Sequence, residues 1–448
     1  MILKQCDKME VNETSMPQVS LPKGWELRLL GELATIFSGG TPNRKNPEYW
    51  DGDIPWVTTT LIDGGEIFEA NEFITQKGLK GSSAKWCKAG TILMAMYGQG
   101  KTRGKVALLG IDATINQACA AIELSELCSK EYVLYLLISK YEQIRELSNS
   151  GGQENLSSRI IRNLEVPLPP QKEQIIIANV LSDTNALITE LEQLIAKKQA
   201  IKTATMQQLL TGRTRLSQFA KHPDGSLKGF TSSELGVIPE DWIISPLSQM
   251  GHVLRGVSYN GSRDLYPHDT EDSVRLFRSN NIHNSKVDLA NLQYVTKNRV
   301  AYHQLMNGGD ILICMANGSK SLVGKAAIYN IEDGHKYTFG AFMGVFRTFA
   351  EVESLYAFYL LTSDRCRSYL DLALAGSSIN NLKPSDIEQF TFALPNSEEQ
   401  KAIVTILSDM DAELETLEKK LSKARDIKQG MMQQLLTGRI RLPLDQQP

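Results

Sequence analysis

The chain has 448 residues, a formal net charge of −3 and 22% charged residues, which fit an ordinary globular protein of two to four domains. No stretch approaches the roughly 20 uninterrupted apolar residues that a membrane span needs, and the N-terminal residues lack a secretory apolar core. Six cysteines are scattered without a Cys-x-x-Cys spacing or a nearby histidine pair, so we expect a reduced, cytoplasmic protein without a zinc site or disulfides. The small net charge gives no global sign of a polyanionic partner.

The first globular domain is expected at residues 22–166, after an N-terminal tail of residues 1–21. Between Phe73 and Ile111 this domain has seven basic residues and not one aspartate or glutamate. Hydrogen-bonding side chains are interleaved with these charges, a mixture that suits the reading of base edges while lysines hold phosphates. The run could equally be a solvated face, so by itself it leaves a nucleic-acid role open. The candidate contact residues are Lys77, Lys80, Tyr97, Gln99, Lys101, Arg103 and Lys105.

Part of this run is similar to a phosphate-binding loop. The segment from Ala95 to Thr102 fits the loose pattern of a small residue, four positions and Gly-Lys-Thr, and it follows a strand-like stretch. A true phosphate loop opens a helix, so that backbone amides and the helix dipole face the phosphates. Here the chain continues from Lys105 as an extended apolar run, and the matching loop Cys314–Ser321 lacks Gly-Lys-Thr. We therefore interpret the segment as a recognition loop and not as an ATP site.

A long helix is predicted next, within residues 167–213, and a linker at residues 214–237 follows it. Prolines at positions 167, 169 and 170 stand where a helix can begin, and Gly212 stands where it should end. A helix from Gln171 to about Leu210 would be about 60 Å long. Its apolar residues follow alternating spacings of four and three, the heptad pattern of a coiled coil. A single stripe of this kind could equally pack on its own domain.

The second domain is expected at residues 238–393 and matches the first domain only at scattered anchors. Pro239-Glu-Asp-Trp242 corresponds to Pro22-Lys-Gly-Trp25, and Gly308–Ile313 corresponds to Ala89–Met94. The anchors are strand cores and glycine turns, which specify a fold, while the polar loops between them differ. One scaffold would thus present two different recognition surfaces. The candidate contact residues in this domain are Arg275, Arg278, Asn280, Asn281, Asn317, Lys320 and Lys325.

The last segment, residues 394–441, is predicted to be a second long helix that repeats the first. Met206-Gln-Gln-Leu-Leu-Thr-Gly-Arg213 recurs as Met432-Gln-Gln-Leu-Leu-Thr-Gly-Arg439, at an offset of 226 residues (432 − 206). Two matched stripes can bury each other, so we expect an antiparallel coiled coil with pseudo-two-fold symmetry. The pairing residues would be Leu181, Ile188, Leu191, Ile195, Leu407, Leu414, Leu417 and Leu421. The helix macrodipole is enough to explain the basic residues that follow the helices, namely Arg213, Arg215, Arg439 and Arg441.

The sequence offers little that could carry catalysis. Glu399-Gln-Lys401 and Glu418-Lys-Lys420 have the Glu-x-Lys form of a nuclease half-site, but both lie on the predicted second helix without a strand-borne aspartate upstream. The six histidines fall outside any metal-ligand spacing. We therefore expect an α+β protein, with two globular α/β domains joined by two long helices, that recognises and positions a partner. It would bind no cofactor or metal of its own.

On these motifs the chain resembles the specificity subunits of type I restriction-modification systems, and the resemblance covers nearly the whole chain. In the first domain it rests on Leu29-Leu-Gly-Glu-Leu33, on Ser38-Gly-Gly-Thr-Pro42 and on Tyr49-Trp-Asp-Gly-Asp-Ile-Pro-Trp56. It also includes Pro167-Leu-Pro-Pro-Gln-Lys-Glu-Gln174, which leads into the long helix, and the Gln-Gln-Leu-Leu-Thr-Gly-Arg motif that closes both helices.

The resemblance implies a reader of double-stranded DNA with a bipartite target. Each of two target-recognition domains would read one half of an interrupted, asymmetric site, and the helices would act as a ruler for the spacer. Two methylation subunits, which carry S-adenosylmethionine, would dock on the exposed helix faces around Asp183–Gln208 and Asp409–Gln434. Restriction subunits of the complex would bring ATP and Mg²⁺. Half-sites about one helical turn apart would suit this geometry.

Two other classes of protein stay open. A stand-alone nuclease or NTPase is disfavoured by the missing acidic metal site, and Mg²⁺-dependent cleavage by the purified chain would favour it. A coiled-coil adaptor that does not bind DNA is disfavoured by the basic stretches of both domains. Such an adaptor would show no salt-dependent binding to DNA.

Overall fold

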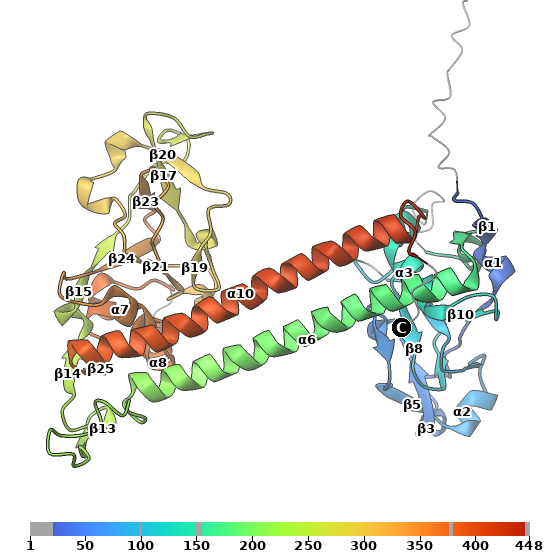
Figure 1. The fold of residues 1–448 in the computed structure, drawn as a ribbon, viewed down its shortest axis with the longest axis horizontal. Helices are drawn as coiled ribbons and strands as arrows, with labels where there is room; N and C mark the ends of the chain where they lie inside the picture. The colour runs from blue at the N-terminus through green and yellow to red at the C-terminus, as the bar shows by residue number, and fades with distance from the viewer. Residues whose placement is uncertain (1–20, 99, 148–154, 376–379, 444–448) are drawn as a thin grey trace, which may run out of the picture. The chain divides into compact units, whose positions relative to one another are not determined.

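The computed structural model describes residues 21–98, 100–147, 155–375 and 380–443, which form two compact units. Unit 2 is made of residues 193–418, and unit 1 is made of the described residues on either side of that range. Each unit contains one globular domain and part of both long helices, α6 (Gln171–Leu210) and α10 (Ser397–Leu435), drawn in green and red in Figure 1. Among the described residues, we find no helix with the length and apolar character that a transmembrane span requires.

The domain of unit 1 contains a five-stranded sheet of order β2-β10-β7-β8-β4 and a four-stranded sheet of order β5-β3-β9-β6. All pairs are antiparallel except β3 with β9 and β4 with β8, and β1 pairs with β11 just before α6. The strands are β1 (Glu26–Leu29), β2 (Ala34–Ser38), β3 (Trp50–Val57), β4 (Glu66–Ile67), β5 (Glu72–Ile74), β6 (Trp86–Cys87), β7 (Ile92–Ala95), β8 (Val106–Leu109), β9 (Ala113–Ile115), β10 (Cys119–Leu124) and β11 (Glu165–Leu168). The shorter helices are α1 (Leu30–Leu33), α2 (Gln76–Lys80), α3 (Lys130–Ser139), α4 (Tyr141–Leu147) and α5 (Ser158–Arg162).

The continuous apolar sequence of β7 reflects burial of this strand on both faces. Ile92 and Met94 pack into a core that includes residues of α3 and of both long helices, while Leu93 and Ala95 pack into a second core with residues of β3, β8 and β9. Alternate residues of a strand point to opposite faces of its sheet, so a strand buried on both faces needs an uninterrupted apolar run. The five-stranded sheet is therefore the central layer of this domain.

The domain of unit 2 repeats this arrangement, with one sheet of order β15-β24-β21-β22 and another of order β16-β20-β17-β23. Its strands are β14 (Ile243–Pro246), β15 (Gly251–Arg255), β16 (Leu265–Tyr266), β17 (Ser273–Phe277), β18 (Ile282–His283), β19 (Lys286–Val287), β20 (Gln293–Thr296), β21 (Ile311–Cys314), β22 (Ala326–Ile328), β23 (Tyr337–Phe339), β24 (Met343–Thr348) and β25 (Thr391–Leu394). Its shorter helices are α7 (Ser354–Leu361), α8 (Asp364–Ala375) and α9 (Pro384–Glu388). A hairpin of β12 (Phe230–Ser233) and β13 (Gly236–Pro239) lies between α6 and this domain in the chain.

The predicted internal repeat is confirmed by the sheet topology. The order β15-β24-β21-β22 corresponds strand for strand to β2-β10-β7-β8, and the pair β14–β25 corresponds to β1–β11. The strand β21 also has two buried faces, because Ile311 and Ile313 pack into the core with α7 and α8 while Leu312 and Cys314 pack into another core. The anchors that the two halves share in sequence are therefore the buried central strands.

The long helices begin and end close to where the sequence predicts. Helix α6 spans Gln171–Leu210, and α10 begins at Ser397 because Thr391–Leu394 forms strand β25. Gly212 and Gly438 follow the helices with φ of 69° and 70°. This left-handed conformation closes a helix and is open to glycine at little steric cost.

Within each unit, α6 and α10 are in contact and run antiparallel. In unit 1, Glu192 pairs with Arg425 at 2.6 Å and Asn185 accepts a hydrogen bond from Lys428 at 2.6 Å. In unit 2, Lys198 pairs with Glu413 at 2.7 Å and Lys202 pairs with Asp411. The predicted pairing residues that are buried are Leu181, Ile188, Leu407, Leu414 and Leu417, whereas Leu191, Ile195 and Leu421 are partly buried.

Candidate nucleic-acid interface

Four loops at strand ends come together in each domain, and we call each set the loop cluster. In the second domain the loop cluster comprises residues 256–260, 278–281, 315–318 and 340–342. In the first domain it comprises residues 39–43, 58–61, 96–98 and 116–118. Each set joins the ends of strands from both sheets of its domain, so the buried sheets fix the positions of the loops while the loop sequences are free to differ.

Matched backbone hydrogen bonds show that the two loop clusters are built in the same way. Gly40 N donates to Ile115 O at 3.0 Å, and Val257 N donates to Phe339 O at 2.7 Å. A second such pair joins residue 116 to residue 57 and residue 340 to residue 277, both at 3.0 Å. A third joins residue 156 to residue 96 at 3.0 Å and residue 382 to residue 315 at 2.9 Å. The backbone of these loops is therefore held by the scaffold in the same way in both domains.

A glycine is required where two of these loops cross. A Cβ atom on Gly39 would lie 1.9 Å from Ile115 O, and one on Gly256 would lie 2.0 Å from Gly340 O. Any side chain at either position would collide with backbone, so the close crossing explains the glycine in the Ser38-Gly-Gly-Thr-Pro42 motif.

The loop cluster of the second domain surrounds a cleft of about 1160 Å³. Tyr259, Asn280, Asn317 and Phe342 are among its lining residues, and Arg278 is the charged residue among them. Asn317 Nδ2 donates to Ser279 Oγ at 3.3 Å. The cleft is thus lined mainly by amides, hydroxyls and aromatic rings, groups that can contact the edges of bases.

The predicted contact residues of the first domain lie on different elements. Lys77 and Lys80 are on α2, where Lys77 pairs with Glu48 at 3.5 Å. Tyr97 is 39% exposed in the loop that follows β7 and belongs to the loop cluster. Lys101 and Lys105 belong to the same connection between β7 and β8, and the carbonyl of Lys101 accepts a hydrogen bond from Tyr141 at 2.6 Å. The basic run is therefore divided between α2 and this connection.

Arg103 is 7% exposed, so its side chain is buried in the domain. This burial does not fit the expectation that Arg103 reaches into a DNA groove. Gln99 lies outside the described residues.

In the second domain, two of the predicted contact residues have structural roles instead. Arg275 pairs with Asp269 at 2.8 Å and with Asp333 at 3.2 Å, and it donates to Tyr337 Oη at 2.9 Å. Burial opposes its charge, but the hydrogen bonds that Arg275 donates to Asp269 and Tyr337 outweigh this and raise the pKa of Arg275. The sequence could not reveal these partners, because Asp333 and Tyr337 come from a distant strand region.

Asn281 is the second predicted contact residue that has a structural role. It is fully buried, and its amide accepts from Arg278 N at 2.9 Å and donates to the carbonyls of Asp288 and Ala290. The expectation that Arg275 and Asn281 contact DNA thus does not fit the structure, because their polar groups are already satisfied inside the domain.

The remaining predicted residues of this domain lie at or near the cleft. Arg278, Asn280 and Asn317 line it. Lys320 is exposed, with its Nζ 3.5 Å from Asp371 O, and the partly buried Lys325 donates to Ile282 O at 3.3 Å. The sequence therefore identified three residues of this surface.

Sequence reasoning missed Tyr259 and Phe342 in this loop cluster and Thr41 in that of the first domain. Phe342 is 72% exposed, and Thr41 donates to Gln117 Oε1. The available signal was the glycine at positions 39 and 256, where a Cβ atom would collide with a crossing backbone segment close to Thr41 and Tyr259. The segment that Gly256 crosses is Gly340, two residues before Phe342.

The structure supports the expectation that Ala95–Thr102 is not the phosphate-binding loop of an ATP site. Its role as a recognition loop stays a prediction. The chain leaves β7 at Ala95 and enters strand β8 at Val106. A phosphate loop would require a helix at this place. In the described ranges there is also no cluster of histidine, cysteine, aspartate or glutamate that could hold a metal ion.

The cysteines that the structure describes are free thiols. Burial raises the pKa of Cys87, Cys119 and Cys366 to about 12, so these thiols stay protonated near neutral pH. Such cysteines are poor nucleophiles and poor metal ligands.

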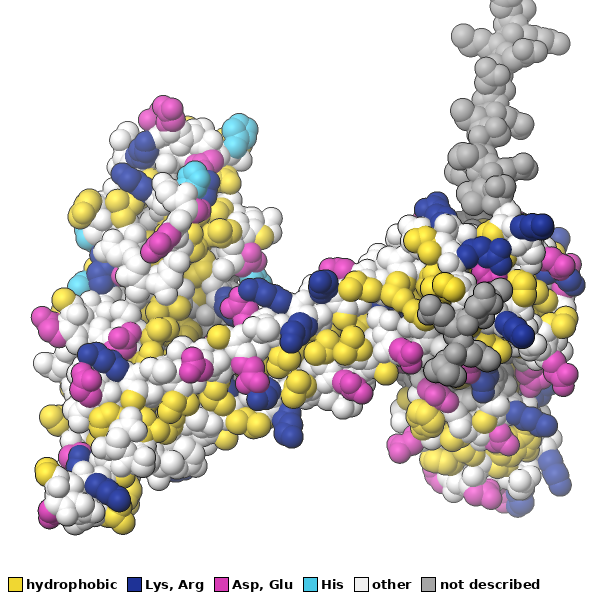
Figure 2. Space-filling model, viewed as in Figure 1, with side chains coloured by type: hydrophobic (Ala, Val, Ile, Leu, Met, Phe, Trp, Pro, Cys, Tyr) yellow, Lys and Arg dark blue, Asp and Glu magenta, His cyan; other side chains and the backbone are white. Residues whose placement is uncertain are grey.

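On the face that Figure 2 shows, lysine and arginine side chains are interspersed with aspartate and glutamate over both units.

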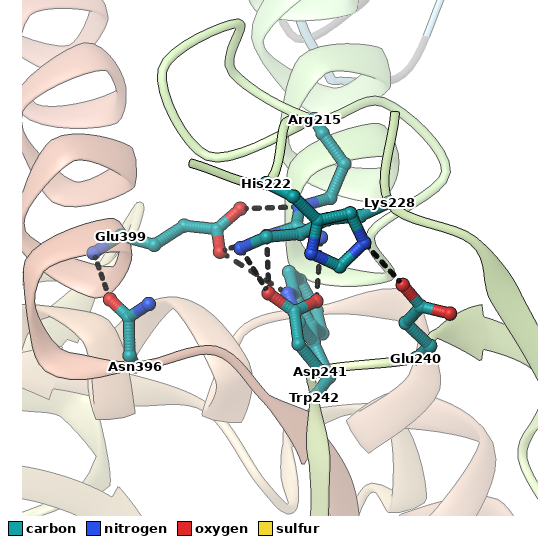
Figure 3. A network of polar contacts seen from close by, with 8 residues as sticks. All are labelled: Arg215, His222, Lys228, Glu240, Asp241, Trp242, Asn396 and Glu399. Atoms are coloured by element: carbon teal, nitrogen blue, oxygen red, sulfur yellow. Dashed lines mark hydrogen bonds and ion pairs between the residues drawn. The ribbon is translucent and has the colours of Figure 1, made fainter. Parts of the chain in front are cut away.

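Two of the four arginines that follow the long helices, Arg215 and Arg441, have specific partners, which corrects the macrodipole interpretation for these two. Arg215 makes two hydrogen bonds to Glu399, of 2.8 and 2.7 Å, and pairs with Asp241 at 2.7 Å (Figure 3). Trp242 Nε1 donates to the same glutamate at 3.3 Å, and Lys228 pairs with Asp241 at 2.7 Å. We call this network the clamp of unit 2. It fastens the segment after α6 to the start of α10.

A corresponding clamp is present in unit 1. Arg441 makes hydrogen bonds of 2.9 and 2.6 Å to Glu173, and Trp25 Nε1 donates to this glutamate at 3.2 Å. The clamp of unit 1 fastens the segment after α10 to the start of α6. Glu399, which the sequence showed within a Glu-x-Lys pattern, thus has a structural role.

Two copies of one scaffold, each with its own loop cluster and its own clamp, define the class of the protein: a duplicated protein that presents two sets of loops on one kind of domain. A family model described as "Type I restriction modification DNA specificity domain" matches residues 22–203 and again residues 239–424. The chain belongs to this family, which confirms the resemblance drawn from its motifs and the expectation of a non-catalytic recognition subunit.

Individual relatives match the chain to different extents. The type I restriction enzyme MjaVIII specificity subunit of Methanocaldococcus jannaschii is 24% identical over 441 residues, with 97% of each chain covered. The EcoKI specificity subunit of Escherichia coli (strain K12) is 32% identical over 205 residues, which are 46% of this chain and 44% of that relative, so this chain spans under half the length of that relative. The S subunit of a type I restriction-modification system from M. genitalium has the same fold, with a TM-score of 0.57 at 15% identity, over 95% of this chain and 98% of that chain.

Proposed function

We propose that the chain is the DNA-reading subunit of a type I restriction-modification complex and that its two domains read the two halves of a bipartite site in double-stranded DNA. The observation that carries the proposal is the presence of two loop clusters on one duplicated scaffold, with matched backbone hydrogen bonds and different side chains. Residues 22–166 and 238–393 are proposed as the two target-recognition domains, with residues 214–237 as a linker.

The side chains of the loop clusters support different half-sites. In the first domain the loop cluster presents hydroxyls and amides. Thr41 is hydrogen-bonded to Gln117, and the hydroxyls of Thr58 and Thr60 are 2.7 Å apart. In the second domain the corresponding loops carry Tyr259, Asn280 and an exposed phenylalanine. Because base edges are read by hydrogen-bonding and apolar groups, two different sets of groups should select two different sequences.

The two long helices are proposed to pair as an antiparallel coiled coil that sets the length of the spacer. Antiparallel ion pairs in each unit support this, as does the burial of Leu181, Leu407, Leu414 and Leu417. A leucine that is fully buried in this way contributes about 1.5 to 3 kcal/mol. A rigid pair would keep the two half-sites at a fixed spacing on the duplex.

The complex is proposed to contain two methylation subunits, which bind S-adenosylmethionine, and restriction subunits, which bind ATP and Mg²⁺. Exposed apolar side chains on the helices support docking of such partners, since Leu187, Leu194, Ile201 and Ile427 are each between 39% and 48% exposed. The proposed location of the complex is the cytoplasm, where its DNA lies.

The test is a genome-wide map of methylated bases in host cells with and without this gene. We expect one bipartite motif to lose its methylation when the gene is deleted and to regain it on complementation. Exchange of residues 22–166 for the equivalent domain of a relative should change one half of the motif only. A map that does not depend on the gene would contradict the proposed function. Mg²⁺-dependent cleavage by the purified chain would instead favour a nuclease.

A further inference from the structure

The cleft of the second domain presents an aromatic ring on a fixed turn. Phe342 is 72% exposed, although its neighbour Met343 is buried. The Phe342 carbonyl accepts hydrogen bonds from Met315 N at 2.9 Å and from Ala316 N at 3.1 Å, and Met343 N closes the turn by donating to Gly340 O at 2.8 Å. The backbone of this turn is therefore held in place, and the Phe342 ring stays exposed to water instead of packing in the core.

An amide is presented from another loop that lines the same cleft. Asn280 is exposed in the short 3₁₀ turn Ser279–Asn281. The turn is fixed by Asn281, whose buried side chain bonds to the backbone on both sides of it. Among the described residues, the Asn280 side chain has no hydrogen-bond partner. A free amide on a rigid turn is ready to bind a ligand without a loss of internal bonds.

Each of the other amides that line the cleft makes at least one hydrogen bond within the domain. Asn317 accepts from Ser319 N at 3.0 Å and donates to Ser279, Asn380 donates to Gly318 O at 3.2 Å, and Gln293 accepts from Tyr259 Oη at 2.9 Å. Asn280 is therefore the amide in this lining that is best placed to bind a ligand.

The chemistry of the lining favours base edges over phosphates. The charged side chain in it, Arg278, donates through Nη2 to Asn291 O at 3.3 Å, and the rest are amides, hydroxyls, apolar groups and backbone. Phosphate grips use several cationic side chains or a series of backbone amides. In the major groove, an asparagine amide can donate to N7 and accept from N6 of adenine, while an apolar group can contact the thymine 5-methyl group.

We propose that Asn280 and Phe342 together read A·T pairs in the half-site of the second domain. The Asn280 amide binds the N6 and N7 edge of an adenine, and the Phe342 ring covers a thymine 5-methyl group of the same or the adjacent pair. The proposal rests on the proposed function and deepens it, because it assigns the specificity of one half-site to two side chains of this chain.

The experiment changes one functional group of the DNA at a time. The complex that the full-length chain forms in its own host is purified, and its affinity is measured for the methylated motif found by mapping. Each thymine of both half-sites is replaced in turn by deoxyuridine, which lacks the methyl group, and each adenine by 7-deazaadenine, which lacks N7. For the parent complex we expect the affinity to fall about fourfold when one particular thymine is replaced, which is the contribution of one buried methyl group. Replacement of one particular adenine should lower the affinity roughly 5- to 100-fold.

The variants Phe342→Ala and Asn280→Ala complete two thermodynamic cycles. Phe342→Ala should bind the unmodified site about fourfold more weakly and become insensitive to deoxyuridine at that thymine. Asn280→Ala should become insensitive to 7-deazaadenine at that adenine. Tyr302→Ala is the matched control, because Tyr302 is an aromatic residue of the same unit, 90% exposed and outside the cleft. It should keep both sensitivities.

The outcomes separate the two proposals. If no gene-dependent motif exists, the proposed function fails before any variant is tested. If the motif exists and the parent complex binds it, but both variants keep the full sensitivity of the parent to the modified bases, the assignment of Asn280 and Phe342 is overturned while the proposed function stands. Circular dichroism of each variant checks folding, and Phe342→Leu, which keeps an apolar group, should retain part of the methyl sensitivity.

Discussion

The clamps of the two units have the same core but different surroundings. In both, a glutamate in the first turn of a long helix accepts an indole hydrogen bond and a pair of arginine hydrogen bonds. In unit 1, Arg441 uses its remaining Nη1 on the backbone carbonyl of Lys23, and its side chain is 39% exposed. In unit 2, Arg215 uses that nitrogen on the carboxylate of Asp241, and its side chain is 6% exposed.

One sequence difference accounts for the different partners of Arg215 and Arg441. The tetrapeptide that opens the second domain has Asp241 where the first domain has Gly24. Gly24 has a φ of 88°, a left-handed conformation that an aspartate adopts only at a cost, so the first domain could not gain this carboxylate by substitution alone. The comparison shows that a duplicated motif keeps the groups that connect the helices, while its electrostatic surroundings can diverge.

The largest expected effect comes from removing the enclosed arginine. Arg215→Ala should reduce the free energy of unfolding by about 3–5 kcal/mol, because it leaves the buried Glu399 and the adjacent Asp241 without their shared cation. Arg441→Ala should cost less, since water can reach the more open clamp of unit 1. Urea unfolding followed by circular dichroism measures both. Arg213→Ala, an exposed neighbour, should change stability by no more than ~0.5 kcal/mol. Equal losses for the two clamp variants would contradict the comparison.

The apolar contacts of the helices should respond equally in both units. Leu181 and Leu407 occupy equivalent positions of the repeat and are both fully buried. Leu181→Ala and Leu407→Ala should each destabilise the protein by roughly 2–5 kcal/mol, since each leaves a cavity of the same size in matched surroundings. Hydrogen exchange of α6 and α10 should show local loss of protection. Leu187→Ala, at 48% exposure, is the control with little effect. Clearly unequal losses would mean that the two cores have diverged as the clamps have.

A smaller effect is expected when the additional carboxylate is neutralised. Asp241→Asn keeps the shape of the side chain and removes its charge, so the clamp of unit 2 should come to resemble that of unit 1. The Asp241 side chain is 29% exposed, so solvent screens the interaction and the loss should be about 1 kcal/mol. The neighbouring Glu240→Gln, whose partner is His222, serves as control. No loss for Asp241→Asn at neutral pH would show that Arg215 needs only Glu399.

The pH dependence of that difference is the finest test. Burial disfavours the charged carboxylate of Asp241, but hydrogen bonds from Arg215 and Lys228 outweigh it and hold the pKa below its ordinary value. A carboxyl group with a lowered pKa contributes stability above its unfolded pKa, near 4, and loses it as pH falls through the folded pKa. The stability difference between the parent and Asp241→Asn should therefore be constant from pH 7 to about 5 and shrink as the pH falls below about 4. A difference that does not shrink on acidification would exclude an electrostatic origin.

The sequence allowed the prediction of features that depend on local patterns. The heptad stripe with its flanking prolines and glycines predicted α6 within the limits that the structure shows, because helix periodicity and caps act over a few residues. The apolar runs around Ile92 and Ile311 predicted the buried central strands in the same way. The strand that follows Lys105 likewise excluded a phosphate loop.

Contacts between distant residues could not be predicted in this way. The macrodipole explanation for Arg215 and Arg441 considered only the adjacent helix, whereas their glutamate partners are 184 and 268 residues away in the chain. Equally, Arg275 and Asn281 are residue types that often contact DNA, but the fold brings carboxylates and carbonyls to them. Phe342 is a residue type that is usually found in the core, but the turn between β23 and β24 keeps it exposed.

The sequence by itself thus determined the duplicated scaffold, its long helices and its family, because repeats, periodicity and motifs are properties of the chain order. Only the tertiary structure decided which polar and aromatic side chains stay free at the loop clusters and which are used inside the domains. The physical reason is that burial and hydrogen-bond satisfaction depend on the sum of all neighbours in space. Those neighbours come from four separate loops in each domain, and their meeting is fixed by sheet pairing over long sequence distances.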